Sequence, residues 1–204
     1  MKVKRLIALL IGLALVGILF FAYCEWCGNP FVKIIAKHKM IDYLETHFKD
    51  ETYETSGVSF NFKDNSYMLK VDVENSEDGD FTVEYNNGKV WDNYDWLVSE
   101  RNNTGTRLQI YLNKEDREDI LKDIFGDQFD WAIMLVDEQA WEKDLPELDM
   151  SIEDMLAKYP IHLSIYLKEG SKVDDIEKIK EEITERYLQT GIKLSLIEFD
   201  TVTK

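Results

Sequence analysis

Two cysteines three positions apart, Cys24 and Cys27, have the spacing that most resembles a chemical motif in this chain. A C-x-x-C pair acts as a redox dithiol when its first sulfur lies at a helix N-terminus in a strand–helix–strand unit. Here the pair instead follows a long apolar run. A structural zinc site would need two further ligands, and His38 and His47 are a helix away along the chain. The pair is interpreted as passive, with thiol chemistry retained as the alternative.

Hydrolytic chemistry has less support in the sequence. The histidines are His38, His47 and His162, and there is no G-x-S-x-G elbow, P-loop or dinucleotide fingerprint. His162 lies on the polar face of a predicted strand, which favours a surface residue over a catalytic base. The sequence therefore assigns no catalytic, cofactor-binding or metal-ligating residue, and we do not expect an enzyme.

Two clusters of carboxylates are the next candidates. The first, in a predicted hairpin loop, contains Glu74, Glu77, Asp78 and Asp80. Its Asp-Gly-Asp sequence resembles a calcium loop, but the twelve-residue spacing places Tyr85 where an EF-hand has glutamate. A solvated turn is the main interpretation and weak cation binding the alternative. The second cluster is interpreted as a hydrated loop and contains Glu142, Asp144, Glu147 and Asp149.

Aromatic side chains are numerous in the part of the chain that follows the cysteines. The candidates are Trp91, Tyr94, Trp96, Trp131 and Trp141. Packing inside or between lobes is the main interpretation, because aromatic rings bury large apolar areas. The alternative is a patch that binds a protein partner.

The candidate residues above all follow an apolar segment, Leu6–Tyr23, which contains no charged residue. As a helix this segment is roughly 27 Å long, close to the thickness of a bilayer core. It is longer than the apolar core of a cleaved signal peptide, so we expect an uncleaved, single-pass signal-anchor. Lys2, Lys4 and Arg5 predict a cytoplasmic N-terminus and an extracytoplasmic C-terminal domain at the cell membrane.

Charge sets further limits on partners. The chain has 24 basic and 40 acidic residues. Lys2, Lys4, Arg5 and Glu25 precede residue 28, so the remainder carries a net charge of −18 (21 − 39). Such a domain repels nucleic acid and, as a whole, anionic headgroups. Three lysines near the membrane are interpreted as a solvated face, with contact to anionic lipid as the alternative; they are Lys33, Lys37 and Lys39.

The first half of the domain shows one helical pattern followed by strand patterns. Asn29 and Pro30 predict the start of a helix through about Lys49. Its predicted apolar stripe comprises Phe31, Ile34, Ile35, Ile41, Leu44 and Phe48. Period-two alternation then predicts strands over residues 58–62, 67–73, 81–85 and 89–91, with a hairpin turn at residues 86–88. We expect the helix to pack on this antiparallel meander.

The order of these segments resembles a known family. The basic N-terminus and apolar anchor lead into Gly28-Asn29-Pro30-Phe31, and Val58–Asp64, Phe81–Tyr85, Asn87–Val90 and Asp92–Tyr94 follow. Over residues 1–112 the chain resembles the YfjL-like proteins of low-GC Gram-positive bacteria, and its first half also resembles the related DUF3139 group. The resemblance implies membrane anchoring and this architecture, and it implies no particular activity.

The second half predicts alternating helices and strands. Residues 92–112 fit either a strand or a helix interrupted near Thr104-Gly105. Further on we expect a helix capped by Asn113 and ended by Gly126, a strand over 131–136, and a short helix capped by Ser151. A strand over 161–167, a helix capped by Ser171 and a last strand over 192–200 complete the pattern, and the final two strands can pair in parallel.

Together these patterns predict an α+β protein: a transmembrane helix, a helix packed on an antiparallel meander, and a small C-terminal α/β sandwich. The expected divisions are 1–27 (cytoplasmic tail, anchor and juxtamembrane segment), 28–95 (helix and meander) and 96–204 (C-terminal lobe). The expected function is binding or interaction in the cell envelope, with the bilayer contacted through residues 6–23 and an envelope protein as partner. The alternatives are a thiol-active or hydrolytic enzyme and a weak cation-responsive sensor.

Overall fold

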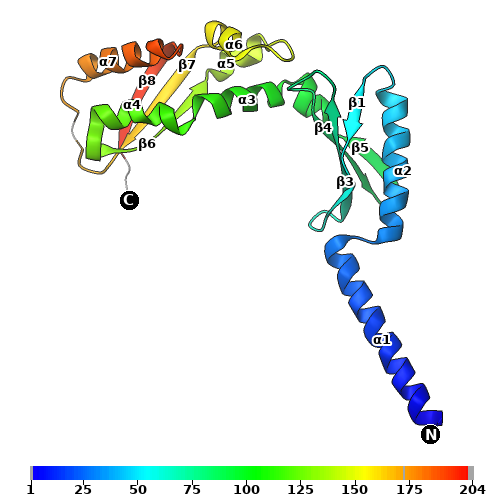
Figure 1. Ribbon diagram of the computed structural model, residues 1–204. Helices are drawn as coiled ribbons and strands as arrows, with labels where there is room; N and C mark the ends of the chain where they lie inside the picture. Colours follow the sequence, from blue (N-terminus) through cyan, green and yellow to red (C-terminus); the bar gives the residue numbers. More distant parts are fainter. Residues whose placement is uncertain (1, 172, 202–204) are drawn as a thin grey trace. The chain divides into compact units, whose positions relative to one another are not determined.

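The computed structural model describes residues 2–171 and 173–201, and the side chains of residues 7–171 and 173–200. Two compact units are present, residues 1–97 and residues 98–204. Each contains one sheet, which in the first unit is covered by α2 and in the second by several helices (Figure 1). The mixed helix-and-sheet composition, with a long apolar helix first, confirms the predicted α+β class.

The first unit begins with α1 (Lys2–Cys27), the long apolar helix. A window of 18 residues in the helical stretch from Ile7 has a mean hydropathy of 2.7 and no buried residues. By length and composition, α1 can cross a membrane. It is followed by α2 (Pro30–His47), whose predicted start is confirmed, because the Asn29 side chain accepts a hydrogen bond from the Phe31 N–H at 2.9 Å.

The sheet of the first unit is antiparallel. Its strands are β1 (Tyr53–Thr55), β2 (Ser59–Asn61), β3 (Ser66–Val73), β4 (Phe81–Asn86) and β5 (Lys89–Asp92). β1 and β2 both pair with one edge of β3, and β4 and β5 continue from the other edge. The predicted meander is therefore present, and β1 is a strand that the sequence pattern did not predict.

The packing of α2 corrects the predicted apolar stripe. The side chains that α2 buries are Ala36, Met40 and Leu44, and it contacts β3, β4 and β5. Phe31, Ile34 and Ile35 are instead 70%, 60% and 52% exposed. α2 carries apolar residues on two faces, and a period of 3.6 residues does not say which face meets the sheet.

A short joint connects α1 to α2 and lies against the first sheet. Gly28 has a φ of +79°, and an added Cβ there would lie 2.7 Å from the Phe60 ring and 2.9 Å from the Tyr67 ring. The Tyr67 hydroxyl donates a hydrogen bond to the Asn29 carbonyl at 3.1 Å, and the Trp26 and Phe62 rings lie 5.5 Å apart. The hairpin of β2 and β3 thus holds the base of α1 in place.

The second unit contains five α-helices and a three-stranded sheet in its described residues. The helices are α3 (Asn102–Leu112), α4 (Glu115–Phe125), α5 (Glu138–Lys143), α6 (Ile152–Lys158) and α7 (Ile176–Gln189). The strands are β6 (Phe129–Val136), β7 (Ile161–Leu167) and β8 (Leu194–Thr201). β7 is central, antiparallel to β6 and parallel to β8. The parallel pair follows the sequence expectation.

The ambiguous segment of residues 92–112 is helical. A π-type turn, η1 (Asp95–Ser99), precedes α3. The helical conformation is interrupted between them at Arg101, whose φ is +63°. The expected interruption at Thr104-Gly105 is wrong, because both residues lie inside α3. Gly105 has no side chain and so leaves room for the Trp141 ring, which would lie only 3.3 Å from a Cβ added at position 105.

Three expected features of the second unit's helices are also corrected. Asn113 does not cap α4, whose N-cap is Lys114 without a side-chain bond, and Ser171 does not cap α7, whose N-cap is Asp175 in a left-handed conformation. α5 extends into the start of the expected hydrated loop, because Glu142 lies in its last turn. The Ser151 cap of α6 and the end of α4 at Gly126 are confirmed.

The core of the second unit lies between one sheet face and the helices. Leu163 and Ile165 of β7 are 1% and 0% exposed. They pack in one cluster with buried residues of four helices: Leu108, Leu112, Leu121, Phe125, Met155, Leu156, Ile183 and Tyr187. Burying this face excludes water and supplies most of the stabilisation available to such a small sheet.

We predict that Gly28→Ala loosens the joint between α1 and the first sheet. The substitution adds strain of about 1–3 kcal/mol at a positive φ and a clash with two rings. Hydrogen–deuterium exchange of the full-length chain in detergent should show faster exchange in residues 59–67. Gly57→Ala is the matched control, because an added Cβ there meets nothing within 4 Å. Equal exchange in both variants would contradict the prediction.

Candidate functional site

The cysteine pair lies in the last turn of α1. Cys24 is half-buried, Cys27 is exposed, and both are free thiols. Redox C-x-x-C pairs lie at the positive N-terminal end of a helix, whereas this pair lies at the C-terminal end. The geometry therefore lacks the feature that would activate either sulfur.

The three histidines lie far apart along the chain, on separate elements or turns. His38 is exposed on α2, and the His47 ring stacks on Tyr43 with centroids 4.1 Å apart. His162 on β7 pairs with Asp137, with 3.2 Å between Nε2 and Oδ2. Among the described residues, no histidine is hydrogen-bonded to a serine, threonine or cysteine. The sequence pattern placed His162 on the outer face of its strand but did not reveal Asp137 as its neighbour.

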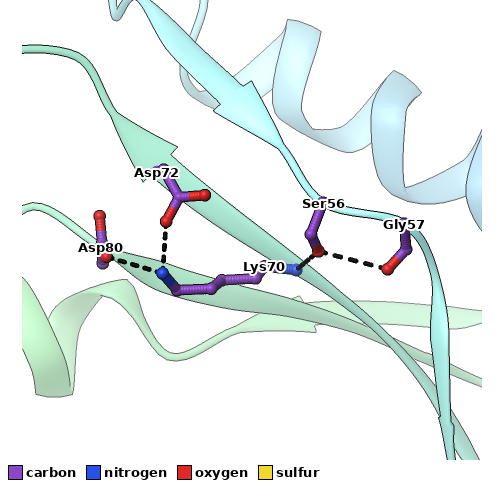
Figure 2. Close-up of polar contacts among 5 residues, drawn as sticks. All are labelled: Ser56, Gly57, Lys70, Asp72 and Asp80. Atoms are coloured by element: carbon purple, nitrogen blue, oxygen red, sulfur yellow. Dashed lines mark hydrogen bonds and ion pairs between the residues drawn. The ribbon is translucent and has the colours of Figure 1, made fainter.

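One member of the first acidic cluster, Asp80, contacts a lysine of β3. The Lys70 ammonium donates to Asp80 Oδ2 at 2.9 Å and also to Asp72 Oδ1 (Figure 2). The ammonium thus pairs with two carboxylates, one of which, Asp80, belongs to the acidic cluster. The described part of the chain contains no group of three or more His, Cys, Asp or Glu arranged to hold a metal ion.

This ion pair changes the pKa of both partners. The hydrogen bond from Lys70 holds the pKa of the Asp72 carboxyl below its usual value. The bond to Asp72, followed by the bond to Asp80, raises the pKa of Lys70. A lowered carboxyl pKa stabilises the fold above the unfolded pKa, and this contribution is lost as the pH falls through the folded value. All three side chains are more than a third exposed, so the energy involved is small.

We predict that Lys70→Met raises the pKa of Asp72 towards the ordinary aspartate value, because its main stabilising donor is removed. Carboxyl-carbon NMR titration of the full-length chain measures this shift. Lys122→Met, which removes an exposed lysine from Glu118 on α4, is the control and should leave Asp72 unchanged. An unchanged pKa of Asp72 in Lys70→Met would show that the lysine does not lower the pKa of this carboxyl.

The second acidic cluster is partly structural. The Lys158 ammonium lies 3.0 Å from Asp144 Oδ2, and the Tyr159 hydroxyl donates to the Asp144 carbonyl at 2.6 Å. These bonds attach the end of α5 to the end of α6. The cluster is therefore not a set of hydrated carboxylates alone.

The aromatic candidates separate into packed and exposed groups. Tyr94 packs against Phe48 and Phe81 at 5.0 and 5.2 Å, and Trp141 packs against Tyr159 at 5.0 Å. Trp91 and Trp96 are exposed in the first unit, and Trp131 is 42% exposed in the second. Packing is confirmed for Tyr94 and Trp141, while Trp131 lies on a surface.

That surface is the outer face of the second sheet, opposite the helix-covered core. Trp131 stacks on Tyr166, with centroids 3.8 Å apart and ring planes within 5°. Strand register places further residues on the same face: Ile133, Leu135, His162, Ser164, Leu196, Glu198 and Asp200. Leu135 and Leu196 are 44% and 42% exposed. We call these nine residues the outer face.

The two edges of this sheet differ. At the β6 edge, Asn113 Oδ1 accepts from the Met134 N–H at 2.9 Å, and the Met134 carbonyl accepts from Asn113 Nδ2 at 3.0 Å and Gln109 Nε2 at 2.6 Å. Side chains of α3 and the residue after it thus take the place of a neighbouring strand. This is the role of Asn113, which local sequence reasoning assigned to a helix cap.

The β8 edge has no comparable protection. In the described part of the chain, β8 pairs with β7 alone, and no side chain bonds the backbone of residues 194–199 along its outer edge. A recess of about 550 Å³ borders this edge, with Leu196 and Glu198 on one side and Ile176 and Lys180 of α7 on the other. An unpaired strand edge is a template for another extended chain.

We predict that Asn113→Ala destabilises the second unit by about 1–3 kcal/mol, because the Met134 N–H is left without its acceptor. Gln109→Ala is the matched control and should cost less, since the Met134 carbonyl keeps the Asn113 bond. Urea-dependent hydrogen–deuterium exchange of β6 in the full-length chain measures the loss of stability in both variants. Equal losses would mean that the edge bonds of Asn113 contribute nothing specific.

The fold and these surfaces define a class of α+β protein with an apolar N-terminal helix, a helix-covered antiparallel sheet and a second small sheet. Residues 3–94 match the family described as YfjL-like, N-terminal domain. The chain therefore carries a YfjL-like N-terminal domain, which confirms the family resemblance over this range. No curated protein and no solved structure matches the chain.

Proposed function

We propose that this protein is a single-pass membrane-anchored module of the cell envelope that binds an extended segment of another envelope protein along the β8 edge and the outer face. α1 is the anchor and stays uncleaved. The N-terminus is cytoplasmic, as Lys2, Lys4 and Arg5 favour, and both sheets are extracytoplasmic. The protein acts by binding rather than by catalysing a reaction.

The observation that carries this proposal is the contrast between the two edges of the second sheet. At the β6 edge, two side chains bond the N–H and carbonyl of Met134, while the β8 edge borders a recess and continues into exposed apolar residues. Natural sheets usually protect their edges, so a long unprotected edge beside an apolar face supports strand addition by a partner. The partner's backbone would pair with β8, and its alternate side chains would contact Leu196 and the Trp131–Tyr166 stack.

Charge narrows the partner class. Glu198 and Asp200 lie on the outer face beside Leu196, within a domain of strongly negative charge. An extended segment that alternates apolar and basic side chains complements this surface, whereas an acidic segment is repelled. Nucleic acid is disfavoured as a partner for the same reason.

We predict that a photo-crosslinkable residue at Glu198 captures a partner protein in intact cells, while the same residue at Glu181 on α7 does not. Both glutamates are exposed, so the pair is matched. Leu196→Lys should lower the yield at position 198 about tenfold, which corresponds to about 1.4 kcal/mol. Leu188→Lys, at a leucine 58% exposed on α7, should leave the yield unchanged.

Two measurements test the membrane orientation and the binding at the β8 edge separately. A membrane-impermeant thiol reagent added to intact cells should label Leu188→Cys in a variant whose native cysteines are replaced by alanine. Labelling only after lysis would overturn the orientation. Equal adducts at positions 198 and 181, or equal effects of the two lysine substitutions, would overturn binding at the β8 edge.

A further inference from the structure

The base of the first unit exposes apolar side chains that the fold does not use. Around the joint, Trp26 is 71% exposed, Phe31 70%, Ile34 60%, Ile35 52% and Phe62 53%. Four of them lie within two helical turns of Gly28, and Phe62 contacts Trp26. We call these five residues the joint patch. The buried face of α2 lies elsewhere, at Ala36, Met40 and Leu44, so the joint patch does not contribute to the core.

The charge of α2 changes sign along its length. Residues 30–39 contain Lys33, Lys37 and Lys39 and no acidic residue, and all three lysines are exposed. Residues 40–47 contain Asp42 and Glu45 and no lysine or arginine. The positive half of α2 begins next to α1, although the domain as a whole is strongly negative. This local reversal complements an anionic surface at the joint.

The joint patch also lies at the right distance from the apolar segment. The apolar run ends at Tyr23, and residues 24–27 add about 6 Å of helix. The polar layer of a bilayer is roughly 5–8 Å thick on each side of the hydrocarbon. Gly28 then lies near the outer limit of the headgroups. Aromatic rings and lysines with long apolar stems are the residues that favour this layer.

Resting on the membrane anchoring proposed above, we infer that the joint patch and Lys33, Lys37 and Lys39 form a second, interfacial membrane contact that takes anionic phospholipid headgroups. The rings and isoleucines lie at the boundary between headgroups and acyl chains, and the ammonium groups contact lipid phosphates. Because the β2–β3 hairpin packs on Gly28, this contact orients the whole first sheet on the bilayer.

A second copy of the chain is a poorer occupant of the same surface. Two-fold symmetric dimers place the same patch of each copy face to face. Such a contact through the first two turns of α2 would bring the three lysines of one copy near those of the other. Like charges oppose this association, whereas lipid phosphates neutralise them.

Site-directed spin labelling of the full-length chain in vesicles tests the inference. With both native cysteines replaced by alanine, single labels are placed at Ile35→Cys and Asp42→Cys, which lie on the same side of α2 about 10 Å apart along its axis. A third label at Leu13→Cys reports the anchor. Vesicles contain phosphatidylcholine alone or with phosphatidylglycerol, and collision with oxygen is compared with collision with a nickel chelate.

We predict a several-fold higher oxygen-to-nickel ratio at position 35 than at position 42, increasing with phosphatidylglycerol. Replacing Lys33, Lys37 and Lys39 by glutamine should abolish that increase. A water-like ratio at position 35 with a lipid-like ratio at position 13 would overturn the interfacial contact and leave the anchor intact. A water-like ratio at position 13 would overturn the anchoring itself. Dipolar broadening between labels at position 35 would assign the patch to a second copy and overturn the lipid contact.

Discussion

A small sheet has two faces and two edges, and the need to keep each of them from unfavourable exposure shapes the second unit. The helices cover one face, and Asn113 and Gln109 supply to Met134 of β6 the hydrogen bonds that a neighbouring strand would give. Within the second unit, the described residues include no further element that does the same for β8 or for the outer face. In these described residues, the fold therefore leaves the backbone groups of one strand edge unpaired and one stacked aromatic pair exposed. An extended peptide can pair with such an edge and pack its side chains on such rings. The surface proposed to bind a partner follows from the same constraint that builds the core.

The sequence predicted those elements whose burial follows a single period. β3, β4 and β7 alternate cleanly because each strand has one buried face, and Asn29 caps α2 because the bond is local. The predicted stripe of α2 was right for Leu44 but wrong for the exposed Phe31, Ile34 and Ile35, because that helix has two apolar sides and only tertiary packing chooses between them. Asn113 was assigned to a cap for a related reason. Its side chain can bond locally or across the structure, and the longer-range bond to Met134 is the one formed.

The surface contacts were beyond the sequence because they join distant segments. Lys70 meets Asp80 across a hairpin, His162 meets Asp137 at the start of α5, and Trp131 meets Tyr166 through the register of two strands thirty-five residues apart. Composition indicated abundant carboxylates and tryptophans but not their neighbours. A carboxylate beside an ammonium and a tryptophan stacked on an exposed tyrosine have different chemistry from the same residues in isolation.

The proposed membrane attachment changes how strong the proposed β8 contact needs to be. Strand addition along an eight-residue strand offers roughly four to five backbone hydrogen bonds, each worth about 0.5–1.5 kcal/mol net. Association of two free proteins costs about 4–15 kcal/mol, so these bonds alone give little affinity. Contact of apolar side chains with Leu196 and the Trp131–Tyr166 stack adds to them. Confinement of both proteins to one membrane then raises their effective concentration, as a tether does. A module of this kind can therefore bind its partner at the membrane while remaining unassociated with the same segment in solution.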